Sequence, residues 1–175
     1  MKKNIILLLS VVVLFGCTTT YRDSEGNIVS REKIDALRTV AVKRNLDERR
    51  FRIFIDKIYP VGMPVRTLNS DYVIEVSRDS IGMELPYIGR LDRAPINGYV
   101  GLHGILPIRS YKSEPTKDGE RIFIEAHNET EIYNIILNVY NNGTTNISLK
   151  SNIRSSIDYS GYMQLNAKFV PIYVK

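Results

Sequence analysis

From Phe51 onward, apolar and polar side chains alternate with a period of two, and this limits the possible folds more than any other feature of the chain. Successive side chains of a β-strand point to opposite faces of the sheet, so the alternation predicts strands with one buried face. No helical pattern separates these segments, which argues against the βαβ repeat of a parallel sheet. Strands are predicted over residues 51–56, 72–77, 81–85, 109–117, 121–127, 131–141, 144–150 and 156–165, with a last edge strand over 169–174.

Tight-turn signals join several of these segments. Asp118-Gly119 and Asn142-Gly143 predict two hairpins, because both residues of such pairs tolerate positive φ, and Asn97-Gly98 is a further turn signal. We therefore predict a mainly β (α+β) fold, either an antiparallel β-sandwich or a curved barrel-like sheet of about eight to ten strands. The strand over 131–141 is half-apolar on its second face, so we expect something to cover part of that face.

One N-terminal amphipathic helix is predicted over about 31–46. Ser30 has the features of its N-cap, and Ile34, Leu37 and Ala41 fall on one face, which we expect to cover the half-apolar strand face. The arginines near its end are interpreted as a solvated polar face, with contact to anionic lipid as the alternative: Arg44, Arg49 and Arg50.

Cys17 is the only cysteine of the chain, and it follows a charged start and a short apolar run. The junction Leu14-Phe15-Gly16-Cys17 is typical of a bacterial lipoprotein export signal, so we predict that Cys17 is lipidated. A membrane-spanning helix would need about 20 apolar residues, and an ordinary secretory signal would leave the cysteine without a role. The predicted organisation is a signal peptide over 1–16, a lipidated tether over 17–29 and one globular domain over 30–175.

The charge balance excludes a nucleic-acid-binding arm. Removal of the signal takes away Lys2 and Lys3 and lowers the formal charge from +5 to +3, with no basic run left. A single cysteine also leaves no internal disulfide. The residues after Cys17, Thr18-Thr19-Thr20-Tyr21-Arg22, lack an acidic run that would direct surface export. We therefore expect an outer-membrane lipid anchor in the bacterial envelope, facing the periplasm.

Reactive constellations have little support in the sequence. His103 and His127 are the only histidines, and no HExxH motif or cysteine pair is present, so no metal site and no cofactor are predicted. Ser155, His127 and Asp158 could be assembled into a triad on paper, but no nucleophile-elbow spacing supports it. We predict no catalytic residue.

Two separated segments resemble a known family. Leu85-Pro86-Tyr87-Ile88-Gly89-Arg90 with Ala94-Pro95, followed much later by residues 151–161, is similar to the hallmark segments of a Bacteroidota lipoprotein family, domain of unknown function 4251. The resemblance covers about Asn45 to Leu165, most of the mature chain. It implies an envelope location and supplies no known reaction.

The two segments hold the candidate site residues, which have two interpretations. In one, Arg90 or Arg154 binds loop carbonyls and stacks on a tyrosine to lock a corner of the sheet. In the other, the same side chains line a mouth for a small anionic or sugar-like ligand. Gly89 is expected to permit a turn closed to other residues, and Gly161 to mark a bulge or a close backbone approach. The candidates are Tyr87, Arg90, Asn152, Arg154 and Tyr159.

Three function classes follow from these features. A lipid-anchored, noncatalytic periplasmic module that binds an envelope protein or a small ligand agrees best with a compact β domain that lacks a reactive constellation. A structural or assembly factor of the outer membrane is the alternative. An envelope hydrolase is the third class, and it would require a pocket with at least two convergent ionisable groups.

Overall fold

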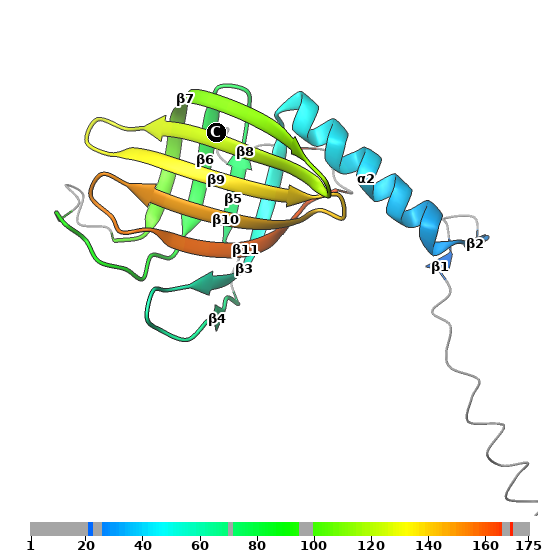
Figure 1. Cartoon of the computed structure of the whole chain (residues 1–175), viewed down its shortest axis with the longest axis horizontal. Coiled ribbons are helices and arrows are strands. Elements are labelled where there is room, and N and C mark those ends of the chain that lie inside the picture. The colour runs from blue at the N-terminus through cyan, green and yellow to red at the C-terminus, as the bar shows by residue number, and fades with distance from the viewer. Residues whose placement is uncertain (1–20, 23–25, 70–71, 95–99, 166–168, 170–175) are drawn as a thin grey trace, which may run out of the picture. The chain divides into compact units, whose positions relative to one another are not determined.

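A computed structural model of the chain describes residues 21–22, 26–69, 72–94, 100–165 and 169, and its elements are shown in Figure 1. The chain divides into two compact units, Met1–Ala36 and Leu37–Lys175. The first unit contains a short antiparallel pair, β1 (Tyr21–Arg22) and β2 (Ile28–Val29), and the start of helix α2 (Arg31–Glu48). The predicted lipidation site Cys17 lies outside the described residues.

The second unit is built around a closed antiparallel barrel. The strand order is β11-β10-β9-β8-β7-β6-β5-β3-β4, and β11 also pairs with β3, so eight strands form a ring to which β4 is added. The prediction of a mainly β fold with one helix is confirmed, and the closed ring decides between the sandwich and the barrel. The strands are β3 (Phe51–Tyr59), β4 (Arg66–Thr67), β5 (Val73–Val76), β6 (Ser80–Leu85), β7 (Leu102–Thr116), β8 (Gly119–His127), β9 (Ile132–Tyr140), β10 (Thr144–Ser151) and β11 (Ile157–Met163).

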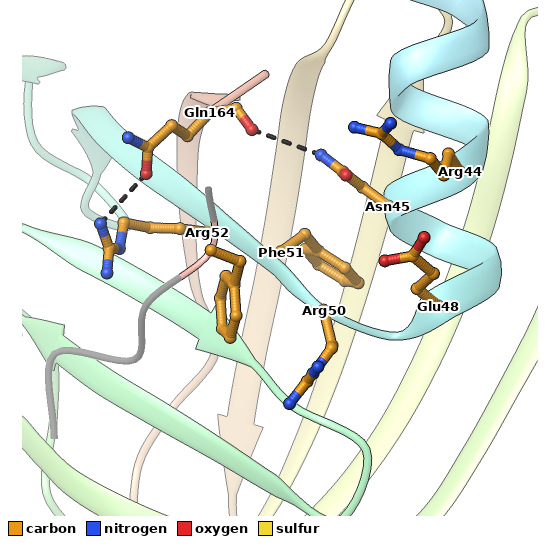
Figure 2. Close-up of a pocket in the computed structure, with 8 residues that line it drawn as sticks. Arg44, Asn45, Glu48, Arg50, Phe51, Arg52 and Gln164 are labelled. Carbon is orange, nitrogen blue, oxygen red and sulfur yellow. Dashed lines mark hydrogen bonds between the residues drawn. The ribbon is translucent and has the colours of Figure 1, made fainter. Parts of the chain in front are cut away.

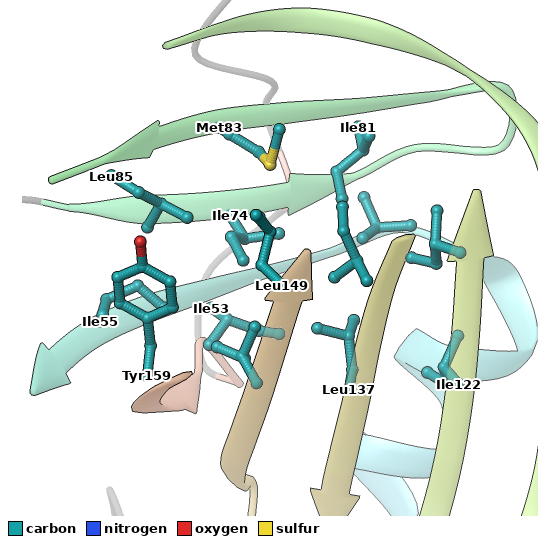
Figure 3. Close-up of a cluster of buried hydrophobic side chains, with 14 of the residues drawn as sticks. Ile53, Ile55, Ile74, Ile81, Met83, Leu85, Ile122, Leu137, Leu149 and Tyr159 are labelled. Atoms are coloured by element: carbon teal, nitrogen blue, oxygen red, sulfur yellow. The ribbon is translucent and has the colours of Figure 1, made fainter. Parts of the chain in front are cut away.

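Apolar side chains fill the interior of the barrel. Eight strands enclose a space just wide enough for side chains, and the alternating residues of each strand occupy it. Figure 3 shows isoleucine, leucine and methionine side chains from facing strands converging there, together with Tyr159. The barrel therefore has a packed core, and its fully buried side chains include Phe51, Ile53, Ile58, Ile74, Ile81, Leu102, Ile122, Ile135 and Leu137.

Gly161 closes the ring at the seam between β11 and β3. The register shifts between Ser160 and Gly161, which is the bulge expected from the sequence. A Cβ atom at Gly161 would lie 2.0 Å from the carbonyl oxygen of Phe54 on the neighbouring strand. Only glycine allows the two backbones to approach this closely, and the bulge bends the strand where the barrel closes.

The two predicted hairpins are present. Some of the other predictions concern residues that the structure does not describe. Asp118 lies in the β7–β8 turn, and Gly143 has a φ of 87° in the β9–β10 turn. Asn97-Gly98 and the expected strand over 169–174, apart from Phe169, lie outside the described residues. Across the described ranges, no helix combines the length and apolar character that crossing a bilayer requires.

Helix α2 begins as predicted but buries a different face. The Ser30 hydroxyl accepts a bond from the Lys33 backbone N–H at 3.3 Å, which confirms the N-cap. The buried residues are Val42 and Leu46, whereas Leu37 is 59% exposed, so the expected apolar face was wrong. Within the part of the helix that belongs to the second unit, Val42 and Leu46 join the barrel core.

The expectation that the helix covers the second face of the 131–141 strand was also wrong. This face forms part of the outer wall of β9, where Ile132 and Tyr140 are exposed. Val42 belongs instead to the core cluster that includes Met163 at the end of β11. The inward face of β9 fills the barrel, and its outer face stays partly exposed, as scattered apolar side chains on a protein surface commonly do.

We expect Gly161→Ala to lower the free energy of unfolding by about 2–3 kcal/mol, because the added Cβ forces β3 and β11 apart. Urea unfolding followed by circular dichroism measures the change. Ser156→Ala, at an exposed position just before β11, is the matched control and should change stability by less than about 0.5 kcal/mol. Equal stability of both variants would show that the seam tolerates a side chain.

Candidate functional site

Two ends of the barrel contain the polar groups that are candidates for function. The motif end is formed by residues 86–94, the β8–β9 turn and the β10–β11 turn. The helix end is formed by the C-terminal turns of α2, the start of β3 and the end of β11. Because the core fills the space between them, each end is a separate site.

At the motif end, Tyr87 and Ser155 bind the two hallmark segments to each other. The Tyr87 hydroxyl donates to the carbonyl oxygen of Arg90 at 2.8 Å and lies 3.0 Å from the Ser155 hydroxyl. The backbone N–H of Arg90 donates to the Ser155 hydroxyl at 3.1 Å, and the Ser155 N–H returns a bond to the Arg90 carbonyl at 3.0 Å. The Leu91–Arg154 bridge continues this pairing.

Arg154 is the centre of a buried charged network at the same end. It is 3% exposed, and its Nε donates to Glu131 Oε1 at 2.8 Å, while its Nη1 donates to the Val100 carbonyl. Its guanidinium carbon lies 5.1 Å from the centroid of the Tyr87 ring, within the range of a cation–π interaction. The Arg154 guanidinium is therefore held by Glu131, by the Val100 carbonyl and by the Tyr87 ring at the same time.

Glu131 accepts further bonds that complete the network. The Tyr133 hydroxyl donates to its Oε2 at 2.7 Å, and the Ser151 hydroxyl donates to its Oε1. Burial, followed by the hydrogen bond to Glu131, raises the pKa of Tyr133 well above its ordinary value. Ser151 in turn accepts the backbone N–H of Arg154 at 3.1 Å, which orders the β10–β11 turn.

The remaining predicted site residues have separate positions. Tyr159 is 1% exposed, its hydroxyl donates to the Pro86 carbonyl at 2.8 Å, and burial raises its pKa. Asn152 is exposed and accepts the Ile132 N–H at 3.0 Å. The Arg90 side chain is exposed and pairs with Asp92, so only the backbone of Arg90 joins the cluster.

Tyr87, Arg154 and Tyr159 thus lie packed within the motif end, with their polar atoms bound to protein groups. Gly89 is required there for a reason other than the expected one, because its φ is not positive. A Cβ atom at Gly89 would lie 2.6 Å from the Tyr87 hydroxyl. Sequence reasoning missed Glu131, although Glu131 has the same strand parity as the inward-facing Tyr133 and Ile135.

At the helix end, a cavity of about 330 Å³ lies between α2, β3 and the residue that follows β11. In Figure 2 the helix residues Arg44, Asn45 and Glu48 face Gln164 and Arg52 across Phe51. The Asn45 side-chain amide donates to the Gln164 carbonyl at 3.4 Å, which fixes the helix to the barrel. The complete lining is Arg44, Asn45, Glu48, Arg50, Phe51, Arg52, Gln164 and Phe169.

A tight helix stop produces this arrangement. The N–H of Arg50 donates to the Asn45 carbonyl at 3.1 Å and that of Arg49 to the Leu46 carbonyl at 3.0 Å, which is a Schellman motif. Arg49 takes the left-handed position with a φ of 51°, where glycine is usual. Its guanidinium lies 4.3 Å from the Tyr111 ring centroid, and the chain turns directly into β3.

Positive charge is in excess around the cavity. Arg52 pairs with Glu75 and donates to Gln164 Oε1 at 3.0 Å. Arg44 and Arg50 are exposed and take part in none of the ion pairs found among the described residues. Glu48 is the carboxylate in the lining, and Phe169 adds apolar surface, whereas the Phe51 side chain is buried in the core. The site has the chemistry to bind a small anion that carries an apolar part.

Metal chemistry has no assembled site in the described part of the chain. No group of three or more His, Cys, Asp or Glu side chains in those ranges is arranged to hold an ion. The Ser155 hydroxyl, which could be combined with His127 and Asp158 into a catalytic triad from the sequence alone, is bound to the Tyr87 hydroxyl and to the Arg90 N–H.

Comparison with known proteins identifies similarity in sequence and in fold. A family model described as "Domain of unknown function (DUF4251)" matches residues 33–163. The crystal structure of a DUF4251 family protein from Bacteroides eggerthii DSM 20697 superposes with a TM-score of 0.62 at 13% sequence identity, covering 77% of this chain and 92% of that chain. No curated protein is significantly similar to the chain.

Arg154→Ala should lower the free energy of unfolding by about 3–5 kcal/mol, because it leaves the carboxylate of Glu131 buried without its partner. Arg90→Ala is the matched control within the same motif, and we expect a change below about 0.5 kcal/mol because that side chain is exposed. Thermal and urea unfolding of both variants measure the difference. A stable Arg154→Ala protein would contradict a structural role and favour the ligand mouth.

Tyr111→Phe should raise stability by about 1 kcal/mol, because the Tyr111 hydroxyl is buried and finds no hydrogen-bond partner among the described residues. Burial raises the pKa of Tyr111 from 10.0 to about 12, so the unfolded phenol ionises first. Ionisation of this phenol leaves the stability of the protein unchanged below pH 10 and lowers it as the pH rises from 10 toward 12. Unfolding measured across this range should show a shallower loss in the variant; an unchanged slope would contradict the prediction.

Proposed function

Because the chain belongs to the DUF4251 family, a domain of unknown function, we propose its function from its own geometry: a lipid-anchored, noncatalytic binding module of the bacterial envelope. The ligand is a small organic anion with an apolar part, and it occupies the cavity at the helix end. The observation that carries this proposal is the position of Arg44 and Arg50 at the cavity, where they are exposed and form no ion pair with another described residue.

The chemistry of the lining supports this ligand class. An arginine forms charge-assisted hydrogen bonds to a carboxylate or phosphate, and these are about twice as strong as neutral ones. Arg44 and Arg50, at the C-terminal end of the helix, offer two such groups to an anion, while Phe169 offers apolar contact. Glu48 selects against a ligand that places negative charge on both sides of the cavity.

The polar groups elsewhere in the barrel are already bound to one another, which also favours a binding site at the helix end. The interior is filled by apolar side chains, and the polar atoms of Arg154, Glu131 and Tyr87 are occupied by one another and by the backbone. These groups are therefore committed to the fold. The helix end combines a cavity of about 330 Å³ with exposed cations, which is why we assign binding there.

The proposal also includes the lipid anchor and the cellular location. Cys17 carries the lipid, the leader over 1–16 is removed, and the polar residues that follow form a tether. The anchor lies in the outer membrane and the barrel faces the periplasm, where the cavity meets soluble anions or the acidic group of an envelope protein.

We expect the purified chain to bind phenyl phosphate saturably and inorganic phosphate more weakly, because the phenyl ring adds apolar contact with Phe169. Arg44→Ala combined with Arg50→Ala should weaken phenyl phosphate binding at least about 10-fold, since each charge-assisted bond contributes roughly 1.5–3 kcal/mol. Isothermal titration calorimetry at low ionic strength measures the dissociation constants.

Lys117→Ala combined with Lys150→Ala is the control for net charge. Both lysines are exposed on the barrel and do not line the cavity, so binding should stay within about twofold of the unchanged chain. Equal losses of phenyl phosphate affinity in the two double variants would show that the protein's net charge, and not the cavity, causes the binding. Absence of saturable binding to either probe would refute the assigned ligand class.

A further inference from the structure

The loop between β3 and β4 exposes three large apolar side chains within five residues. Val61 is 79% exposed, Met63 52% and Val65 53%, and only Gly62 and Pro64 separate them. We call residues 60–65 the apolar tip. The hairpin is ordered at its base, because Lys57 pairs with Thr67 and the Met63 N–H donates to the Pro60 carbonyl at 3.3 Å. In Figure 1 it projects from the lower edge of the barrel.

The hairpin that carries the apolar tip has basic and aromatic residues at its base, where Tyr59 pairs with Asp158 of β11. Residues 57–69 contain no aspartate or glutamate, and the exposed Lys57 and Arg66 flank the tip on its two strands. Tyr59 lies at the base, partly exposed, with its hydroxyl 3.2 Å from the Ser160 hydroxyl. Membrane-interface segments place apolar side chains deepest, with a tyrosine and cations at the level of the anionic headgroups. The residues of this hairpin include all three kinds of side chain.

The size of the apolar tip favours a lipid over a protein partner. A stable protein interface buries roughly 800 Å² per partner around a packed centre, whereas three side chains on a narrow projecting loop offer far less. A bilayer needs no complementary shape, and it accepts isolated apolar side chains with cations at the headgroup level.

We propose that the apolar tip inserts into the headgroup region of an anionic membrane and orients the barrel. The tip follows β3 at the motif end, whereas the anion cavity lies at the helix end, so insertion directs the cavity away from the bilayer. The lipid at Cys17 holds the chain at the membrane, and the tip determines which end of the barrel faces it. The inference rests on the proposed anchor but not on the proposed ligand.

The test uses the absence of tryptophan from the chain. Met63→Trp places a single reporter in the tip, and Lys117→Trp places one in the β7–β8 turn at the helix end. Each lipidated full-length protein is reconstituted into vesicles of phosphatidylethanolamine and phosphatidylglycerol, and flotation with intact mass reports the anchor. We expect blue-shifted emission and several-fold stronger quenching by brominated lipid at position 63 than at position 117.

Further variants separate the tip from the reporter itself. Val61→Ser with Val65→Ser, in the Met63→Trp protein, should abolish the quenching, and Lys57→Gln with Arg66→Gln should reduce it to the level in phosphatidylcholine vesicles. A Met63→Trp protein that floats while its reporter stays unquenched overturns the tip proposal alone, and one that does not float overturns anchor and tip together. A blue shift that needs added envelope protein would assign the tip to a protein partner and overturn the lipid assignment.

Discussion

The pairing of β11 with β3 is the constraint on which the structure depends. It converts an antiparallel meander into a ring, and it requires glycine at position 161 because the Phe54 carbonyl occupies the space of a side chain. Once the ring is closed, the buried apolar cluster occupies its interior. Binding groups can then be placed only on the outer wall or at the two ends.

The two ends use charge in opposite ways. At the motif end, Arg154 and Glu131 are buried and bound to each other, to Tyr133 and to the backbone, so their charges order the turns that close the barrel. At the helix end, Arg44 and Arg50 remain exposed beside a cavity. Tyr87 and Arg154, from the two segments that carried the family resemblance, therefore lie in a packed cluster, while the proposed binding residues lie elsewhere.

Much of the fold could be predicted from local patterns. The alternation over 131–141 and the Asn142-Gly143 pair predicted a hairpin that the structure contains, and Gly161 predicted a bulge. Predictions that required a partner surface were less successful. Leu37 was expected to be buried because it lies on an apolar stripe, but Val42 and Leu46 are the buried residues of the helix, so a different face packs against the core.

The sequence by itself determined the strand pattern, the turns and the helix cap, because these depend on interactions between neighbours along the chain. Tertiary structure alone decided that the sheet closes into a barrel, that Arg154 finds Glu131 while Arg90 stays in solvent, and that three arginines surround one cavity. The physical reason is that burial and ion pairing depend on which distant strands meet, and the period-two pattern is the same for a sandwich and for a barrel.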